Sequence, residues 1–282
     1  MTKRAGLLAI AAALLAPAAA PRPTAPGLNH VYVVLDQATF DAIRTSAPIS
    51  ALLGPSDTGL PAYSPPADGT DRFFLRGRRT YLEFFAPANR FKEPIGKVGI
   101  GIAADDAGGL RRIEAGWRRV CAAGLARERV DWTQVTPTVP WYDVLYCKTD
   151  GDAAAPAIWA MLYRPEFGQW LTGKPRVDRR AMLASRRGRF DVAGLTLGVT
   201  KTLYPSIVSQ LSAGGFRRHA IGEGVVLTGD RFALTILPVA GRSRLEAIDI
   251  TTRMGSSARL RLGAADLYMP RTGKVRLQFD AH

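Results

Sequence analysis

Residues 27–36 read GLNHVYVVLD, and this stretch decides the fold. Its residues alternate as in a strand: residues 31, 33 and 35 are apolar and share one face, while His30 and Tyr32 fall on the other. Asp36 is placed to cap a helix that starts near residue 38. A histidine at the start of such an apolar run is either a half-buried ring or a ligand.

The same pattern recurs further along the chain. Residues 97–104, KVGIGIAA, predict a second strand, and Asp105 and Asp106 can cap the helix after it. A third strand, FDVAGLTLGV, precedes a helix with Pro205 in its first turn. The hairpins RFFLRGRRTYLEFFAP and VLTGDRFALTILP match weakly, with a Gly at each turn and a closing proline. We therefore expect an α+β fold built from repeated units of strand, helix and several strands.

The first hairpin carries a charge in the middle of a strand. Leu82 and Phe84 face one way, whereas Tyr81, Glu83 and Phe85 face the other. A carboxylate at such a position needs a partner or a function, because burying it alone costs several kcal/mol. Glu83 is therefore a candidate site residue.

The N-terminus is typical of an export signal. Lys3 and Arg4 precede the apolar residues 5–16, and Ala16-Pro17-Ala18 offers a cleavage site. The apolar stretch falls short of the roughly 20 residues that span a bilayer. We predict a signal peptide at residues 1–18, export to the periplasm or the medium, and no stable membrane insertion after cleavage.

The chain is strongly basic. Its formal charge is +14, or +12 after removal of Lys3 and Arg4. Such a charge favours anionic partners. The arginines are scattered and form no nucleic-acid-binding module, so we do not expect nucleic acid as a partner.

Two cysteines remain in this exported chain, Cys121 near the end of a predicted helix and Cys147 in a predicted strand. A disulfide between them is chemically allowed outside the cytosol. Two buried thiols are the alternative, because the sequence does not show how close the two residues come.

The first two units resemble the glyoxalase and vicinal-oxygen-chelate (VOC) proteins. The phrases LNHVYVVLD, TYLEFFAP and KVGIGIAADDAGGL look closest to an uncharacterised bacterial glyoxalase-like family. The resemblance covers residues 28–165, and it implies two βαβββ units whose sheets curl around a central cavity. It also implies a divalent metal held by the first and last strands of each unit, which places His30 and Glu83 as ligands. Imidazole and carboxylate suit Zn, Mn, Fe or Ni, and Glu83 could double as a catalytic base.

The second unit departs from that pattern. Gly99 stands at the position of His30, and Met161 at that of Glu83, or Leu162 if the register slips by one. Two protein ligands hold a transition metal weakly. The alternative is a polar pair, His30 with Glu83, in an otherwise apolar cavity.

The rest of that cavity is predicted to be aromatic. Because side chains alternate between the two faces of a strand, the second unit is predicted to contribute a cavity wall with few large side chains, and aromatic rings line the remaining walls. Such a pocket is the usual form of a small-molecule site, although any single ring could simply fill the core. The predicted binding residues are Tyr32, Tyr81, Phe85, Trp159 and Tyr163.

These patterns predict a domain order and two classes of function. After the signal peptide come a Pro-rich leader at 19–27, a paired βαβββ domain at 28–174, a basic linker at 175–189 and a third α/β unit at 190–282. We expect an exported protein that binds a small molecule in the paired units without a complete metal site. The alternative is a metal-dependent lyase, isomerase or dioxygenase that uses His30 and Glu83.

Overall fold

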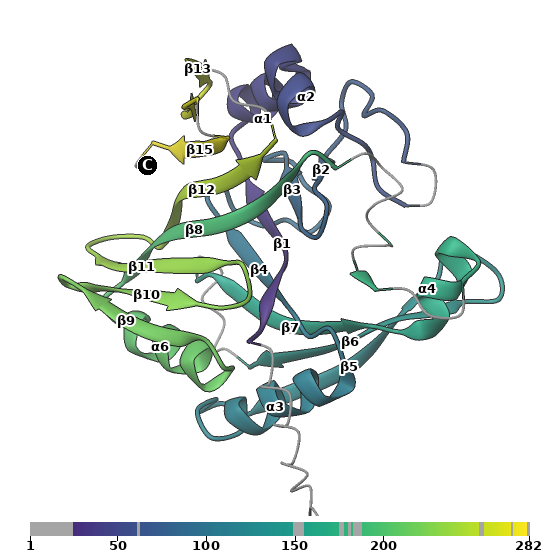
Figure 1. Cartoon of the computed structure of the whole chain (residues 1–282), viewed down its shortest axis with the longest axis vertical. Coiled ribbons are helices and arrows are strands. Elements are labelled where there is room, and N and C mark those ends of the chain that lie inside the picture. Colours follow the sequence, from purple (N-terminus) through teal and green to yellow (C-terminus); the bar gives the residue numbers. More distant parts are fainter. Residues whose placement is uncertain are drawn as a thin grey trace, which may run out of the picture.

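A computed structural model describes residues 25–280, except 61–62, 149–154, 175–177, 180–181, 183–187, 254–256 and 272. The predicted signal peptide, most of the leader and most of the basic linker lie outside the described residues. The described chain forms two mixed sheets with few helices (Figure 1). Among the described residues, no helix is both long enough and apolar enough to cross a bilayer.

The first sheet has seven strands in the order β2-β3-β1-β4-β7-β6-β5. Its centre is the antiparallel pair β1 and β4, and each of these strands also has a parallel neighbour, β3 beside β1 and β7 beside β4. In the parallel pair, His30 lies beside Tyr81 and Tyr32 beside Glu83. The strands are β1 (Gly27–Val34), β2 (Arg72–Arg76), β3 (Tyr81–Phe85), β4 (Val98–Ala103), β5 (Leu125–Trp132), β6 (Val139–Cys147) and β7 (Ala157–Tyr163).

The second sheet has eight strands in the order β13-β14-β15-β12-β8-β11-β10-β9. Again two antiparallel strands, β8 and β12, form the centre, and β8 pairs in parallel with β11. Its strands are β8 (Phe190–Thr200), β9 (Arg217–Ile221), β10 (Gly224–Thr228), β11 (Ala233–Val239), β12 (Arg244–Thr252), β13 (Ala258–Leu262), β14 (Ala265–Met269) and β15 (Lys274–Phe279). Strands β13 and β14 form a hairpin because the chain reverses at Gly263, where φ is +62°.

Helices α1 and α3 begin at the predicted caps. Asp36 accepts a hydrogen bond from the Thr39 N–H at the start of α1, and Asp106 accepts one from the Gly109 N–H at the start of α3. The helix expected after Asp36 is split at Ser46, which caps α2. The helices are α1 (Gln37–Thr45), α2 (Ala47–Leu53), α3 (Ala107–Trp117), α4 (Pro165–Thr172) and α6 (Tyr204–Ala213).

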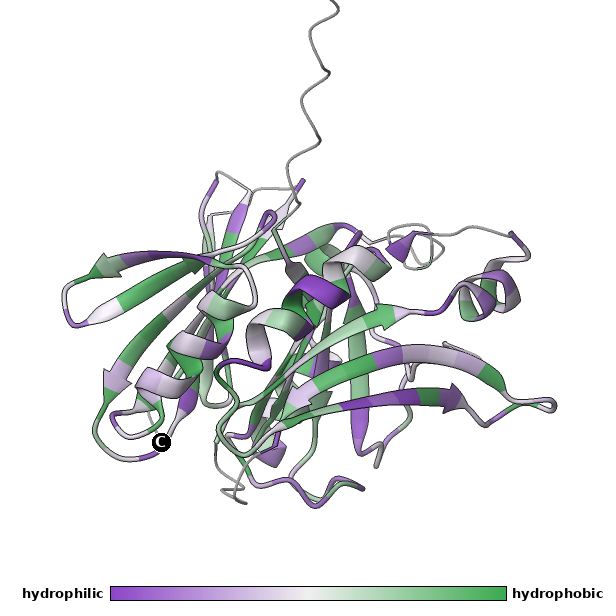
Figure 2. Ribbon diagram, turned by 90° about the horizontal axis from the view of Figure 1, so that it is seen from below, coloured by the Kyte–Doolittle hydropathy of each residue, from purple (hydrophilic) through white to green (hydrophobic). Residues whose placement is uncertain are grey.

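One continuous core joins the two sheets. It contains Val31 and Val33 of β1 together with Leu195 and Leu197 of β8, all at most 4 % exposed. Helices α3 and α6 lie side by side below the sheets (Figure 1). The α3 ribbon shows both polar and apolar residues, as expected for a helix that covers a core (Figure 2). Because one face of β1 is committed to this core, its other face is left for His30 and Tyr32.

Candidate functional site

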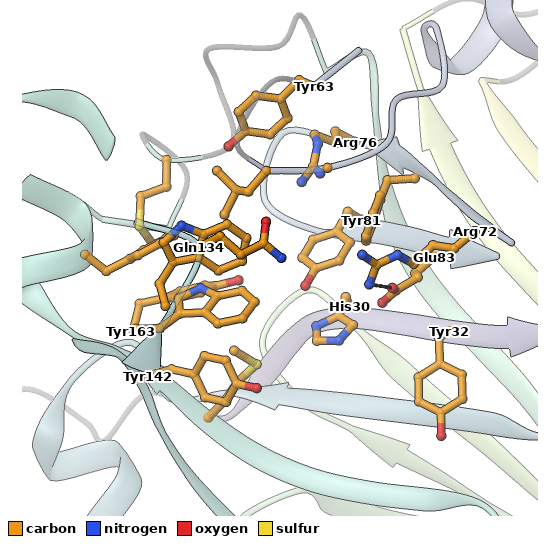
Figure 3. A pocket seen from close by; sticks show the side chains of 18 of the residues that line it. His30, Tyr32, Tyr63, Arg72, Arg76, Tyr81, Glu83, Gln134, Tyr142 and Tyr163 are labelled. Atoms are coloured by element: carbon orange, nitrogen blue, oxygen red, sulfur yellow. Dashed lines mark hydrogen bonds and ion pairs between the residues drawn. The ribbon is translucent and has the colours of Figure 1, made fainter. Parts of the chain in front are cut away.

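A cavity of about 500 Å³ lies against the face of the first sheet that carries His30 and Tyr32. Figure 3 shows Arg72 and Glu83 on one side of the cavity and Tyr142 and Tyr163 on the opposite side. Besides these six, its lining includes Tyr63, Phe74, Arg76, Tyr81, Phe85, Arg90, Phe91, Glu93, Trp132, Gln134, Trp141, Trp159, Met161, Phe167 and Met182.

His30 is held as a neutral ring. The pairing of β1 with β4 shifts register between Leu28 and His30, and at this irregularity Asn29 is buried beside the histidine. The Asn29 Oδ1 atom lies 2.9 Å from His30 Nδ1, so Nδ1 carries the proton and donates it. Burial, helped by the positive charges of Arg76 and Arg179, lowers the pKa of His30 to about 3. The imidazole therefore stays uncharged at neutral pH.

Glycines in β4 let two rings lie flat on the sheet. A Cβ atom at Gly99 would sit 2.0 Å from the Tyr32 ring, and one at Gly101 would sit 2.9 Å from the His30 ring. The His30 ring also stacks on Tyr81, with centroids 4.4 Å apart and planes 6° apart. The wall expected to be bare is thus covered by side chains from β1, and the glycines set how deeply those side chains settle.

Glu83 is buried and pairs with an arginine, not with His30. Its Oε1 atom lies 3.3 Å from Arg72, and its side chain is only 10 % exposed (Figure 3). Burial raises the pKa of Glu83 to about 7, although Arg72, Arg76 and Arg90 act to lower it. At neutral pH this carboxyl is therefore close to half ionised, which suits a group that exchanges a proton.

Arg76 is the most enclosed of the three arginines in the cavity lining. It makes two bonds to Asp57, at 2.7 and 3.0 Å, and both of these side chains are 10 % exposed. Its guanidinium lies over the rings of Tyr63 and Phe74, each 4.8 Å from the ring centroid. This cation is fixed in position and contributes positive potential to the cavity.

A chain of hydroxyl groups leads from the cavity to the histidine. Tyr81 hydrogen-bonds to Tyr163, and the Tyr163 hydroxyl donates to Asn29 Oδ1 at 3.4 Å. Burial raises the pKa of both tyrosines. They remain protonated at neutral pH and act as hydrogen-bond donors.

The far side of the cavity is aromatic. Trp132 and Trp141 meet edge to face with centroids 5.0 Å apart, and Trp141 also packs on Phe167 of α4. The cavity therefore has one wall of charged and hydroxyl groups and one wall of rings.

The structure brings the seven predicted site residues together. His30, Tyr32, Tyr81, Glu83, Phe85, Trp159 and Tyr163 all line this one cavity. Whether they bind a ligand or a metal stays a prediction. The main groups that the sequence reasoning missed are Arg72 and Arg76. They alternate with Phe74 on β2, directly opposite Phe85, Glu83 and Tyr81, and this alternation was the available signal.

The donor set does not fit a divalent metal. Within the described part of the chain, no three His, Cys, Asp or Glu side chains gather as metal ligands. Glu83 already pairs with Arg72, and Arg76 adds a second positive charge nearby. A cation placed between His30 and Glu83 would meet both guanidiniums.

The two cysteines, Cys121 and Cys147, form a disulfide with Cα atoms 5.3 Å apart. It joins the segment after α3 to the end of β6. Strand β6 supplies Trp141 and Tyr142 to the cavity, so the disulfide lies on a strand that builds the aromatic wall.

Solved structures resemble this fold at low sequence identity. A hypothetical protein from Staphylococcus aureus aligns with a TM-score of 0.54 at 10 % identity, over 83 % of this chain and 94 % of that one. A single-residue variant of homoprotocatechuate 2,3-dioxygenase from B. fuscum aligns with a TM-score of 0.45 at 12 % identity, over 92 % and 74 % of the two chains. The homoprotocatechuate 2,3-dioxygenase from Arthrobacter globiformis gives 0.38 at 13 % identity, over 78 % and 63 %. No curated protein matches the sequence significantly.

One family model spans most of the chain. It matches residues 28–272, which include every residue discussed at the cavity, the first sheet apart from Gly27, and the second sheet apart from β15. The chain belongs to this family, the Family of unknown function (DUF5829).

Proposed function

We propose that this chain is an exported glyoxalase-like protein that binds a small, ring-bearing molecule in the cavity of the first sheet without a metal ion. The observation that carries the proposal is the cavity itself. About 500 Å³ is enclosed by a wall of aromatic rings and a wall of buried polar groups. This composition is the usual one for small-molecule sites.

Two features support the glyoxalase-like assignment. The order β1, α1, α2, β2, β3 is followed by β4, α3, β5, β6, β7, and in each set the first strand pairs in parallel with the last. Two of the three sequence phrases that resemble VOC proteins fall on β1 and β3, which supply His30, Tyr32, Tyr81, Glu83 and Phe85 to the cavity, and the third falls on β4 and the start of α3. Export is supported by the apolar residues 5–16 and by the Cys121–Cys147 disulfide, since disulfides persist mainly outside the reducing cytosol.

The proposal is tested by blocking the cavity. Gln134 is exposed on the loop after β5, and its amide points into the cavity (Figure 3). Gln134→Trp should fill the space without disturbing the core, whereas the neighbouring Thr133→Trp serves as the control. A panel of aromatic acids, amides and alcohols is titrated by tryptophan fluorescence in the presence of EDTA. We expect at least one compound to bind, with at least a tenfold loss in Gln134→Trp only. No binding by any compound at millimolar concentration would overturn the proposal.

Metal content distinguishes the alternative. The purified protein is incubated with Zn, Mn, Fe or Ni, desalted and analysed for bound metal. We expect less than one equivalent, because His30 and Glu83 are two donors beside two guanidiniums. One equivalent of metal that is lost in both His30→Ala and Glu83→Ala would replace this proposal with the metal-dependent enzyme.

A further inference from the structure

Three arginines line the cavity, and they differ in how completely they are paired. Arg76 makes two bonds to Asp57, at 2.7 and 3.0 Å, and Arg90 makes two to Asp71, both at 2.9 Å. Arg72 makes one contact with Glu83, at 3.3 Å. A charge-assisted bond is normally about 2.7–2.9 Å long, so the Arg72 contact is the weakest of the three.

Of these three, Arg72 is the one placed to accept a new anion. Arg76 is covered by the rings of Tyr63 and Phe74, and Arg90 is 53 % exposed to water, where an ion pair gains little. The Arg72 side chain lines the cavity and is 25 % exposed. Its guanidinium carbon lies 5.2 Å from the centroid of the Phe74 ring. A planar carboxylate matches the guanidinium fork, and a ring attached to it would meet the aromatic wall.

Such a ligand would change the surroundings of Glu83. Arg72 and Arg76 of β2 and Arg90 after β3 act directly on this carboxyl. The other charged and titratable groups beside it in the cavity lining are His30 and Tyr32 of β1, Tyr81 of β3, Glu93 after β3, which acts on Tyr32, Tyr142 of β6 and Tyr163 of β7. Of these, Arg72 is the largest source of attraction. A ligand carboxylate on Arg72 would weaken that attraction and place a second negative charge nearby, and both effects favour the neutral form of Glu83.

We propose that the cavity binds a ring-bearing carboxylate whose acid group displaces Glu83 from Arg72, and that Glu83, where it is ionised, takes up one proton from solvent as the acid binds. This rests on the proposed small-molecule function. The balance is simple: the Arg72–Glu83 contact breaks, an Arg72–ligand ion pair forms, and a solvent proton bonds to a Glu83 carboxyl oxygen. The protein then carries a neutral carboxylic acid beside the bound anion.

The direction of the pH effect follows from this exchange. In the unliganded protein Glu83, with its pKa of about 7, is ionised above neutral pH and must gain a proton on binding. Affinity for an aromatic acid should therefore fall as pH rises above about 7, by at most about tenfold per pH unit. His30, with a pKa of about 3, and the tyrosines, whose pKa values are raised, do not titrate between about pH 6 and about pH 9. Aromatic acids are ionised throughout this range.

The test uses matched pairs of probes on the full mature chain. Benzoate, phenylacetate and 3-phenylpropionate are compared with their uncharged amides by calorimetry, in phosphate and in Tris, from about pH 6 to about pH 9. We expect the acids to bind more tightly than the amides, with proton uptake that differs between the buffers and a pH slope that the amides lack. Glu83→Gln should remove the slope and the uptake. Arg72→Gln should weaken acid binding at least tenfold but leave amide binding within about twofold.

Two variants outside the cavity serve as controls. Arg259→Gln and Glu128→Gln change a surface arginine and a surface glutamate outside the cavity lining, and both should behave like the parent. If amides bind as tightly as acids, or if acids bind without proton uptake, this inference is wrong while the proposed function stands. If neither acids nor amides bind, the proposed function fails, and this inference with it.

Discussion

In both sheets glycines lie under side chains of a neighbouring strand, but the side chains that cover them differ in chemistry. In the first sheet Gly99 and Gly101 lie under the rings of Tyr32 and His30. In the second sheet Gly194 and Gly198 lie under carboxylates instead: a Cβ atom at these glycines would sit 3.3 Å from an Asp249 oxygen and 2.8 Å from a Glu246 oxygen, respectively. Each of these carboxylates pairs with an arginine of its own sheet, Arg276 or Arg244.

The difference lies in burial. The side chain of Glu83 is 10 % exposed and has one long contact, whereas that of Asp249 is 42 % exposed and accepts two bonds from Arg276, at 2.8 and 3.0 Å. Water screens the second pair, so it can do little beyond modest stabilisation. The first pair is more buried and incompletely satisfied, and a buried carboxyl with one long contact can respond to a ligand. Enclosure of charge, and not charge alone, distinguishes the candidate site.

Removing the disulfide at the first sheet should have the largest effect on the free energy of unfolding. The disulfide joins Cys121 to Cys147, and the two cysteines lie 26 positions apart in the sequence. Replacing both, as Cys121→Ser with Cys147→Ser, should lower the free energy of unfolding by about 3–4 kcal/mol, the loop-entropy value for this separation. Urea denaturation measures this change. A reductant should destabilise the parent to a similar extent and leave the double variant unaffected. An unchanged midpoint in the reduced parent would contradict the prediction.

Neutralising the buried carboxyl should stabilise the protein at high pH. The pKa of Glu83 is raised from 4.5 to about 7 by folding, so the folded state binds the proton more tightly and stability falls as pH rises through that window. Glu83→Gln should therefore be more stable than the parent by up to about 3 kcal/mol at about pH 8 and nearly equal at about pH 4. Thermal unfolding across this pH range is the measurement. Glu246→Gln, at a partly exposed position of the second sheet, is the control, and its stability relative to the parent should not change in this way with pH.

The sequence predicts local features well because they depend on neighbouring residues. Strand parity places His30, Tyr32 and Glu83 on one face, and the caps at Asp36 and Asp106 need only a few residues of context. The end of β5 is a less local feature: the strand stops at Trp132 and has an irregularity between Val130 and Asp131. Irregular pairing of this kind depends on the neighbouring strand.

Partners across strands were the part that sequence could not supply. A histidine and a glutamate on one face suggested a pair. In the structure His30 instead hydrogen-bonds to Asn29, and Glu83 pairs with Arg72. Asn29 is next to His30 in sequence, yet strict alternation places it on the opposite face, and only the register shift brings it to the ring. In the second case the length of the arginine side chain matters, because Arg72 of β2 lies opposite Phe85 and reaches diagonally to Glu83 on the adjacent strand β3.

A glycine-to-alanine change should be tolerated less well in the first sheet than in the second. A Cβ at Gly99 would overlap the Tyr32 ring at 2.0–2.5 Å, whereas one at Gly194 meets nothing closer than 3.3 Å. Gly99→Ala should cost about 2 kcal/mol through overpacking and displace Tyr32. Gly194→Ala should change stability by less than about 1 kcal/mol, because a strand alanine loses less chain entropy than glycine. Denaturant midpoints compare the two, and equal losses would show that Tyr32 moves aside at little cost.

The smallest effect should come from the exposed pair of the second sheet. Asp249→Asn removes one charge from a contact with Arg276 in which the two side chains are 42 % and 40 % exposed. Exposed pairs contribute about 0.2–1 kcal/mol, and salt screens them, so the loss should be about 0.5 kcal/mol at low salt and should vanish at about 1 M salt. Unfolding of Asp249→Asn, Arg276→Gln and the double variant gives the coupling energy directly. A coupling above about 2 kcal/mol that resists salt would mean that this face also encloses its charges, and the contrast between the sheets would then be lost.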